Sequence, residues 1–233
     1  MEAIILAGGV GSRLKSIISD VPKPMALVDG RPFLEIILDN LNDAGFTKIV
    51  LSVGYLSDVI VDYFGDNYKK MKIEYALENK RLGTGGAIKF ALQYCSSEDV
   101  FVFNGDTFLD LDIKSVVELK KVENLPIIVS RHVDDVSRYG ALTLSSNKLT
   151  GYREKLDIGS GLINAGCYYL PTNIMTSFAG LDIFSFEKTC IPVIIENPGF
   201  VVYEYDGLFI DIGIPKDYFV ASKILKKSIE SFR

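Results

Sequence analysis

Residues 3–14 read AIILAGGVGSRL, a short apolar run that ends directly in a glycine-rich loop. The run at 3–7 is continuous rather than alternating, a pattern typical of a β-strand that is buried on both faces of a parallel sheet. Three glycines in four positions allow backbone N–H groups to approach an anion closely, and Arg13 adds a cation that can form two hydrogen bonds to it. The stretch predicts an anion-binding loop after the first strand of an α/β fold.

Two better-known phosphate loops do not fit this stretch. A P-loop requires GxxxxGK[ST], and the chain contains no Gly-Lys pair. A dinucleotide-binding turn requires GxGxxG, and Leu14 stands where its third glycine belongs. The loop alone leaves two interpretations open, an anion site and a plain tight turn with a solvated Arg13.

The chain beyond the loop alternates between helix and strand patterns. Apolar stripes at helical spacing and continuous apolar runs follow one another in this order: helix 33–44, strand 48–53, helix 57–64, strand 73–76, helix 84–94, strand 100–103, helix 113–122 and strand 127–130. Repeated β-α-β units with buried strands predict an α/β, doubly wound, Rossmann-like sheet with right-handed crossovers.

The pattern changes after about residue 131. Strands follow without full helices between them, and Pro215 opens a last helix: strands 140–144, 148–153, 162–170 and 201–205, and helix 216–226. We therefore expect a mixed, mainly parallel sheet with an antiparallel extension. Because no repeat or linker interrupts the chain, we expect residues 1–233 to form one domain with two halves, about 1–131 and 132–233.

Composition excludes several classes of protein. Thirty acidic against 25 basic residues give a net charge of −5, which argues against a nucleic-acid binder. One histidine and three cysteines without CxxC spacing exclude the common zinc sites, and scattered cysteines of odd number fit a reducing compartment. The uncharged stretch 158–181 is interrupted by Asn164, Pro171 and Asn173, so no membrane span is expected. These features predict a soluble, cytoplasmic protein.

A lysine between two prolines, Pro22-Lys23-Pro24, follows the glycine loop by about ten residues. Prolines restrict the backbone on both sides, so a rigidly held Lys23 could reach the same phosphates. Together, LAGGxGSRL and PKPM resemble the sugar-1-phosphate nucleotidyltransferase family, whose members join an NTP and a sugar 1-phosphate into an NDP-sugar and release pyrophosphate. The resemblance implies that Arg13 and Lys23 are catalytic.

Further motifs extend the resemblance to about residue 218 in family order. They are LGTGGA at 82–87, FNGD at 103–106, REK at 153–155, NAG at 164–166 and FIDIGIP at 209–215. The chain departs from the family motifs at Leu156, Phe209 and Ile214, where proline, tryptophan and threonine are usual. None of these departures removes a charged catalytic group.

The resemblance assigns roles to individual residues. The nucleotide would be bound by Leu6, Ala7, Gly8, Gly9, Gly11, Ser12, Arg13, Lys23, Glu78, Gly83, Thr84 and Asp106. The sugar phosphate would be bound by Gly140, Glu154, Lys155 and Asn164, and Mg²⁺ by Asp106 and Asp211. The first half of the chain would then bind the nucleotide and the second half the sugar, and the resemblance also allows a homodimer.

The implied reaction suits these residue types. It joins two anions, so it depends on positioning and charge neutralisation more than on covalent help from the protein. Magnesium binds one or two carboxylates together with phosphate oxygens and water, which fits Asp106 and Asp211 if the fold brings them together. The nucleophile is already an anion, so no general base is required.

The motifs specify the base and the sugar less closely. An ionised Glu78 only accepts hydrogen bonds, which suits the two adjacent donors of guanine better than the single donor of uracil or thymine, if Glu78 points toward the base. The other interpretation is that Glu78 is a solvated surface residue. The short chain with LGTGGAI and SGLINAG looks most like the bacterial heptose 1-phosphate guanylyltransferases, which make GDP-heptose from GTP and D-glycero-D-manno-heptose 1-phosphate for surface glycans.

Two alternatives remain from the sequence. One is a uridylyl-, thymidylyl- or cytidylyltransferase that acts on a hexose 1-phosphate. The other is a nucleotide-sugar glycosyltransferase, whose metal-binding DxD pattern is present at Asp110-Leu111-Asp112.

Overall fold

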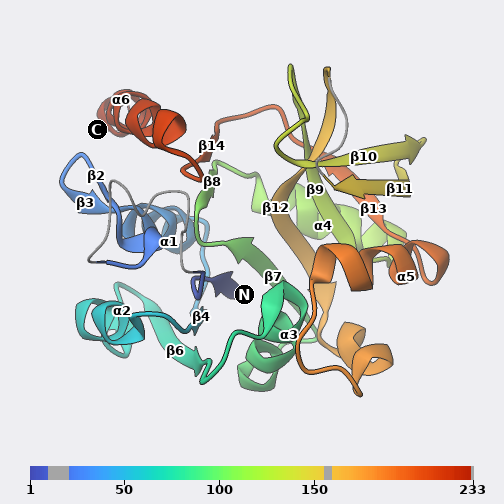
Figure 1. Ribbon diagram of the computed structural model, residues 1–233, viewed down its shortest axis with the longest axis horizontal. Coiled ribbons are helices and arrows are strands. Elements are labelled where there is room, and N and C mark those ends of the chain that lie inside the picture. The colour runs from blue at the N-terminus through green and yellow to red at the C-terminus, as the bar shows by residue number, and fades with distance from the viewer. Residues whose placement is uncertain (10–20, 155–158, 232–233) are drawn as a thin grey trace.

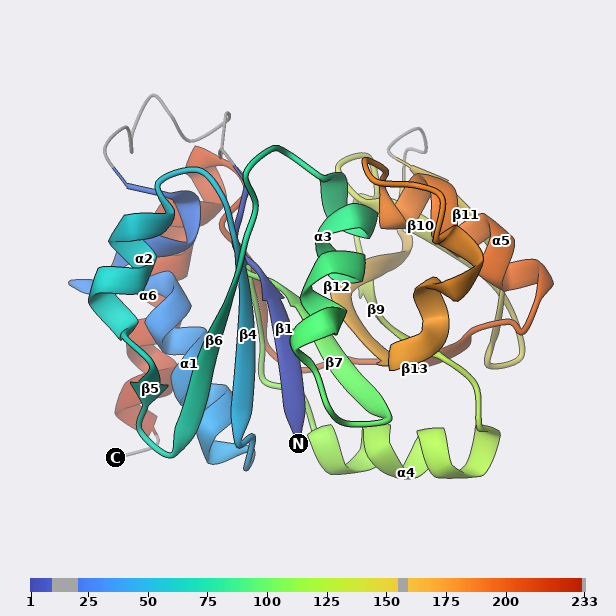
Figure 2. The same ribbon diagram turned by 90° about the horizontal axis from the view of Figure 1, so that it is seen from below.

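A computed structural model describes residues 1–9, 21–154 and 159–231 as a large sheet with helices on both faces (Figure 1, Figure 2). The strands of this sheet are β1 (Glu2–Leu6), β4 (Lys48–Val53), β5 (Asn67–Tyr68), β6 (Met71–Leu77), β7 (Asp99–Asn104), β9 (Ile127–Val133), β10 (Gly140–Ser145), β11 (Lys148–Glu154), β12 (Gly161–Pro171) and β13 (Val201–Glu204). Their order across the sheet is β10-β11-β13-β9-β12-β7-β1-β4-β6-β5.

Parallel pairing is concentrated in the first half of the chain. β1 pairs in parallel with both β4 and β7, and β4 pairs in parallel with β6. β12 then runs antiparallel to β7 and β9, and β10 runs antiparallel to β11. The predicted α/β fold with an antiparallel extension is confirmed.

The helices cover the two faces of the sheet as separate layers (Figure 2). One core contains apolar side chains of α1 (Phe33–Asp43), α2 (Ser57–Phe64), α4 (Ile113–Glu123) and α6 (Pro215–Ser231), together with Ala3 and Ile5 of β1. The other core contains Ile4 of β1 with side chains of α3 (Gly83–Ala91) and α5 (Ile191–Glu196). Successive β1 residues enter opposite cores, which is why the run at 3–7 is apolar throughout.

Several short elements were not predicted. They include the strand pairs β2 (Leu27–Val28) with β3 (Arg31–Pro32) and β8 (Thr107–Leu109) with β14 (Phe209–Asp211), and the turns η1 (Lys23–Met25), η3 (Thr172–Phe178) and η4 (Phe186–Cys190). The turn η2 (Leu92–Tyr94) continues α3 and lies within the predicted helix 84–94. Strands of two or three residues are too short to show a pattern in the sequence. None of the helices in the described ranges is long and apolar enough to cross a membrane.

Candidate active site

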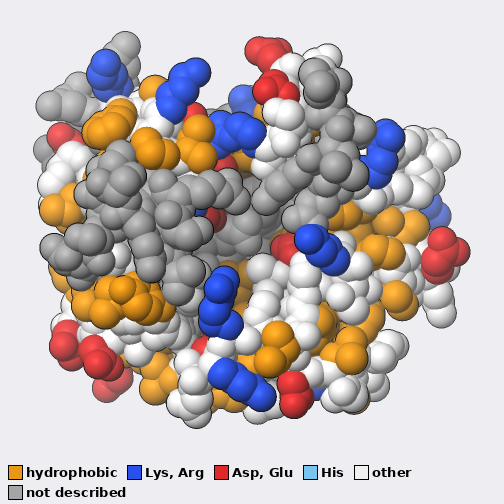
Figure 3. Space-filling view, in the orientation of Figure 1, with side chains coloured by type: hydrophobic (Ala, Val, Ile, Leu, Met, Phe, Trp, Pro, Cys, Tyr) orange, Lys and Arg blue, Asp and Glu red, His pale blue; other side chains and the backbone are white. Residues whose placement is uncertain are grey.

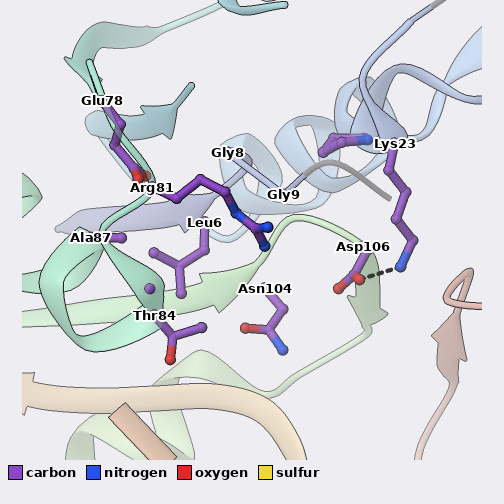
Figure 4. A pocket seen from close by; sticks show the side chains of 12 residues that line it. Leu6, Gly8, Gly9, Lys23, Glu78, Arg81, Thr84, Ala87, Asn104 and Asp106 are labelled. Atoms are coloured by element: carbon purple, nitrogen blue, oxygen red, sulfur yellow. Dashed lines mark hydrogen bonds and ion pairs between the residues drawn. The ribbon is translucent and has the colours of Figure 1, made fainter. Parts of the chain in front are cut away.

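The carboxyl ends of β1, β6 and β7 meet at one edge of the sheet and line a pocket (Figure 4). Leu6, Gly8 and Gly9 come from the end of β1, Glu78 follows β6, and Asp106 follows β7. A Cβ atom at Gly8 would lie 2.9 Å from a carboxylate oxygen of Glu78, so the loop packs tightly against that side chain. This edge is where doubly wound sheets bind ligands.

Glu78 is a half-buried anchor of the pocket. One carboxylate oxygen accepts a 2.9 Å hydrogen bond from the Ser52 hydroxyl, and the other accepts a 3.2 Å bond from the Leu82 N–H. The interpretation of Glu78 as a solvated surface residue is therefore wrong. Each oxygen accepts one of these bonds and retains acceptor capacity for a ligand.

Lys23 forms an ion pair with Asp106 at one end of the pocket (Figure 4). It opens the turn η1, in which the Met25 N–H donates to the Pro22 carbonyl at 2.8 Å. The Lys23 side chain is only 12% exposed, against 35% for Asp106. The structure thus brings together two residues that the sequence separates by 83 positions.

The strand pair β8–β14 places Asp211 beside Asp106. Asp211 lies opposite Thr107 in this ladder, and the Ile212 N–H donates a 3.0 Å hydrogen bond to the Asp106 carbonyl. Burial and the negative charge of Asp106 raise the pKa of Asp211, although the nearby Lys23 opposes this rise. Two close carboxylates beside a single lysine form a site that favours an additional cation.

The donor set at this site fits magnesium. The described ranges contain no group of three or more His, Cys, Asp or Glu side chains arranged to hold a metal. Magnesium does not require such a cage, because it commonly uses one or two carboxylates and completes its shell with phosphate oxygens and water.

A second cavity of about 600 Å³ continues from the first and shares Gly9, Lys23, Thr84 and Asp106 with it. Its remaining wall comes largely from the second half of the chain and includes Gly140, Tyr152, Asn164, Ser185, Glu187 and Asp211. Lys and Arg side chains stand around the middle of the face shown in Figure 3. A cavity of this size can hold a small phosphorylated ligand beside the first pocket.

Asn164 is held at an irregularity of β12. The register with β9 shifts between Asn164 and Tyr168, and Gly166 adopts a φ of +74°, which favours glycine. The Asn164 amide donates to the Tyr168 hydroxyl at 2.6 Å, and its oxygen accepts from the Gly166 N–H at 3.0 Å. These contacts fix the orientation of the side chain at the cavity wall.

Most of the residues assigned from the sequence lie on these two walls. The cavities are lined by Leu6, Gly8, Gly9, Lys23, Glu78, Gly83, Thr84, Asp106, Gly140, Asn164 and Asp211. Ala7 is an exception: it is buried, and its N–H donates to the Ser52 carbonyl at 2.8 Å. Gly11, Ser12, Arg13 and Lys155 lie outside the described residues, as does the side chain of Glu154 at the end of β11.

The second glycine motif is only partly a ligand-facing element. Gly83 and Thr84 line the first pocket, as expected. A Cβ atom at Gly85 would instead overlap the Phe184 ring, and one at Gly86 would lie well within 3.0 Å of the Asp182 carbonyl oxygen. Gly85 and Gly86 therefore face the segment 182–186, which the absence of their side chains allows to pack closely against α3.

Four charged residues of the cavity walls were missed by sequence reasoning: Arg81, Arg138, Glu187 and Lys188. Arg81 extends from the Glu78 end toward the middle of the pocket (Figure 4), and it directly precedes the LGTGG motif. Arg138 lines the second cavity and precedes Tyr139-Gly140. Glu187, which accepts hydrogen bonds from Thr84 and Ser185, lies in no motif. Position beside a motif was a usable signal for Arg81 only.

The DxD pattern has a structural role. Asp112 caps helix α4, and its side chain accepts hydrogen bonds from the N–H groups of Lys114 and Ser115 and from the Ser115 hydroxyl. Helix capping accounts for this aspartate, and neither Asp110 nor Asp112 is among the residues lining the two cavities. This placement disfavours the glycosyltransferase alternative.

The fold and this cleft, in which Lys23 lies beside Asp106 and Asp211, fit a nucleotide-transferring protein, and comparison with known families agrees. The chain belongs to the nucleotidyl transferase family, whose model matches residues 2–228. The family resemblance stated from the motifs is thereby confirmed.

Within this family, the chain is similar to proteins of one particular activity. The chain is 41% identical to the D-glycero-alpha-D-manno-heptose 1-phosphate guanylyltransferase of Campylobacter jejuni, over 94% of this chain and 97% of that protein. It is 37% identical to the enzyme of the same name from Aneurinibacillus thermoaerophilus, over 98% and 100%. The crystal structure of HddC from Yersinia pseudotuberculosis, also solved with GMP-PN, superposes with a TM-score of 0.86 at 40% identity, covering 96% of this chain and 99% of that one.

Proposed function

We propose that this protein transfers a guanylyl group from GTP to D-glycero-α-D-manno-heptose 1-phosphate, which yields GDP-heptose and pyrophosphate. The observation that carries the proposal is the junction of the two cavities at Lys23 and Asp106, because a nucleotide in one and a sugar phosphate in the other would meet there. The names of the two similar enzymes support guanine and heptose as the specific substrates.

The reaction requires a sugar-phosphate oxygen to attack the α-phosphorus of GTP while pyrophosphate leaves. Lys23 would stabilise the negative charge that develops on the α-phosphate, because its cation lies where the two cavities meet. Arg13 and the glycine-loop amides are assigned to the triphosphate. Asp106 and Asp211 would hold Mg²⁺, which neutralises phosphate charge when it is bound.

Guanine recognition is assigned to Glu78. Its carboxylate is fixed by Ser52 and Leu82 at the far end of the first pocket from Asp106 (Figure 4). A fixed pair of acceptor oxygens complements the adjacent N1–H and 2-amino donors of guanine. Ordering of this side chain before the ligand arrives reduces the entropy cost of binding.

Sugar recognition is assigned to the second half of the chain. Gly140 and Asn164 line the second cavity, Glu154 is the last residue of β11, and Lys155 is the next residue in the sequence. The two halves of the single domain would then bind one substrate each. A cytoplasmic location fits an enzyme that consumes GTP, and the homodimer remains a prediction from the resemblance.

A screen of four NTPs against hexose and heptose 1-phosphates, with Mg²⁺ and detection of pyrophosphate, tests this function. We expect the fastest release from GTP with D-glycero-α-D-manno-heptose 1-phosphate, and GDP-heptose in the product by mass spectrometry. Asp106→Asn should abolish release, whereas Asp112→Asn, a matched change at a helix cap, should not, because asparagine caps helices as well as aspartate. Folded protein that releases no pyrophosphate from any pair would contradict the proposal.

A further inference from the structure

Arg138 lies between two carboxylates at the edge of the candidate metal site. Its Nη2 atom is 2.6 Å from an Asp217 oxygen and 3.8 Å from an Asp211 oxygen. The three side chains are partly buried, with exposed fractions of 33% for Arg138, 27% for Asp217 and 18% for Asp211. The same guanidinium nitrogen thus contacts both carboxylates, and it lies closer to Asp217 than to Asp211.

Asp217 is held firmly in the first turn of α6. The next residue, Tyr218, donates its hydroxyl to the Leu27 carbonyl at 2.5 Å and its N–H to the Ile214 carbonyl at 3.0 Å. Leu27 follows the turn that carries Lys23, whereas Arg138 belongs to the rim of the second cavity. The first turn of α6, which begins at Pro215, therefore contacts both walls of the cleft.

Arginine and a divalent cation would compete for Asp211. If the Asp217 carboxylate were absent, the guanidinium would retain Asp211 as its remaining carboxylate partner within 4.0 Å. A close pair between them would neutralise Asp211 and occupy an oxygen that the metal needs. Electrostatic repulsion between two cations would weaken metal binding further.

We infer that Asp217 is a positioning residue that holds Arg138 away from Asp211 and so keeps Asp211 available for the divalent cation. The inference rests on the proposed function, in which Asp106 and Asp211 hold Mg²⁺. It predicts that breaking the Arg138–Asp217 pair from its two sides has opposite effects on the metal. Asp217→Asn frees the competing arginine, whereas Arg138→Met removes it. A role as a simple strap between loop and helix predicts the same effect from both substitutions.

Thermal unfolding in the presence of GTP, without a sugar phosphate, measures metal binding without turnover. Mg²⁺ is titrated at a fixed GTP concentration, and the midpoint of the rise in Tm is compared between variants. Magnesium binds GTP in solution equally in all samples, so differences in the midpoint come from the protein. Each variant is referred to its own metal-free Tm, which removes any general loss of stability. Asp58→Asn, which removes an exposed acid from the first turn of α2, is the matched control.

Asp217→Asn is expected to raise the midpoint at least about threefold, a typical effect of a partly exposed ion pair. Arg138→Met, alone or combined with Asp217→Asn, is expected to give a midpoint at or below that of the wild type, and Asp58→Asn to leave it unchanged. Midpoints that move upward in both single variants, or an unchanged midpoint in Asp217→Asn, would overturn the inference while leaving the proposed function intact. A wild-type protein with no Mg²⁺-dependent rise in Tm would overturn the metal site itself and the inference with it.

Discussion

Replacement of Gly86 by alanine is expected to destabilise the protein, although alanine is the better helix former. Gly86 lies in α3, where exchange of glycine for alanine would ordinarily stabilise a helix by about 0.5–1 kcal/mol. Here the added Cβ would lie well within 3.0 Å of the Asp182 carbonyl oxygen and 2.9 Å from the Leu82 Cβ. The carbonyl belongs to the backbone, so it cannot move away as a flexible side chain can.

The size of the effect follows from these two opposing contributions. Overpacking of this kind costs about 1–3 kcal/mol, which exceeds the gain in helix propensity. We expect a net loss of about 1–2 kcal/mol in the free energy of unfolding, or a decrease of about 2–8 °C in Tm for a chain of this size. The segment 182–186 also accepts backbone hydrogen bonds from Gly85 and Gly86 through the Phe184 carbonyl, so its displacement would weaken these bonds as well.

Chemical and thermal unfolding monitored by circular dichroism would measure this loss. Gly180→Ala is the control, because a Cβ there meets no atom within 4 Å, and its stability should remain within about 0.5 kcal/mol of the wild type. Equal or greater stability of Gly86→Ala would refute the argument that the glycines of this motif exist to admit segment 182–186. A loss of stability of similar size in Gly86→Ala and Gly180→Ala would also refute it.

Three further predictions concern charged groups. Lys23→Ala should lower kcat by about 10²–10³-fold with the fold intact, measured as pyrophosphate release, because a preorganised cation is removed from the reacting phosphate. Glu78→Gln should reduce the preference for GTP over UTP by about tenfold or more in competition assays, since an amide offers one acceptor where the carboxylate offers two; an unchanged ranking would remove Glu78 from base recognition. Burial opposes ionisation of Asp39, but hydrogen bonds from Arg31 and Lys69 outweigh it and lower its pKa. Arg31→Met should therefore cost about 0.5–1 kcal/mol of stability at pH 7, and the difference from the wild type should shrink as the pH falls below about 4, because a depressed carboxylate pKa stabilises only above that range; a difference that is constant with pH would contradict this.

Local patterns were sufficient for most of the scaffold. The predicted strand 48–53 coincides with β4, and the predicted helix 113–122 ends one residue before α4 does. Both elements are long enough for their periodicity to appear in the sequence. Short elements such as β8 and β14 carry no such signal, and they exist because each pairs with the other across about a hundred residues.

For the candidate site, the sequence likewise predicted individual residues but not how they lie relative to one another. Lys23, Asp106 and Asp211 were found because each stands in a motif, and the family resemblance of these motifs implied phosphate and metal chemistry. Their proximity was not predictable, since it depends on η1 and on the β8–β14 pair. The same holds for Glu187 and Arg138, whose positions in the cleft are set by packing between distant segments.

The sequence by itself therefore determined the buried parallel strands, and its motifs pointed to the charged groups through the family resemblance, because strands and motifs depend on residue type and on spacing within about ten positions. Only the tertiary structure decided that Gly85 and Gly86 face a neighbouring segment, that Asp112 caps a helix, and that Arg138 is shared between Asp211 and Asp217. These are contacts between segments far apart in the chain. They depend on which side chains meet after the sheet has formed, and no local pattern records that.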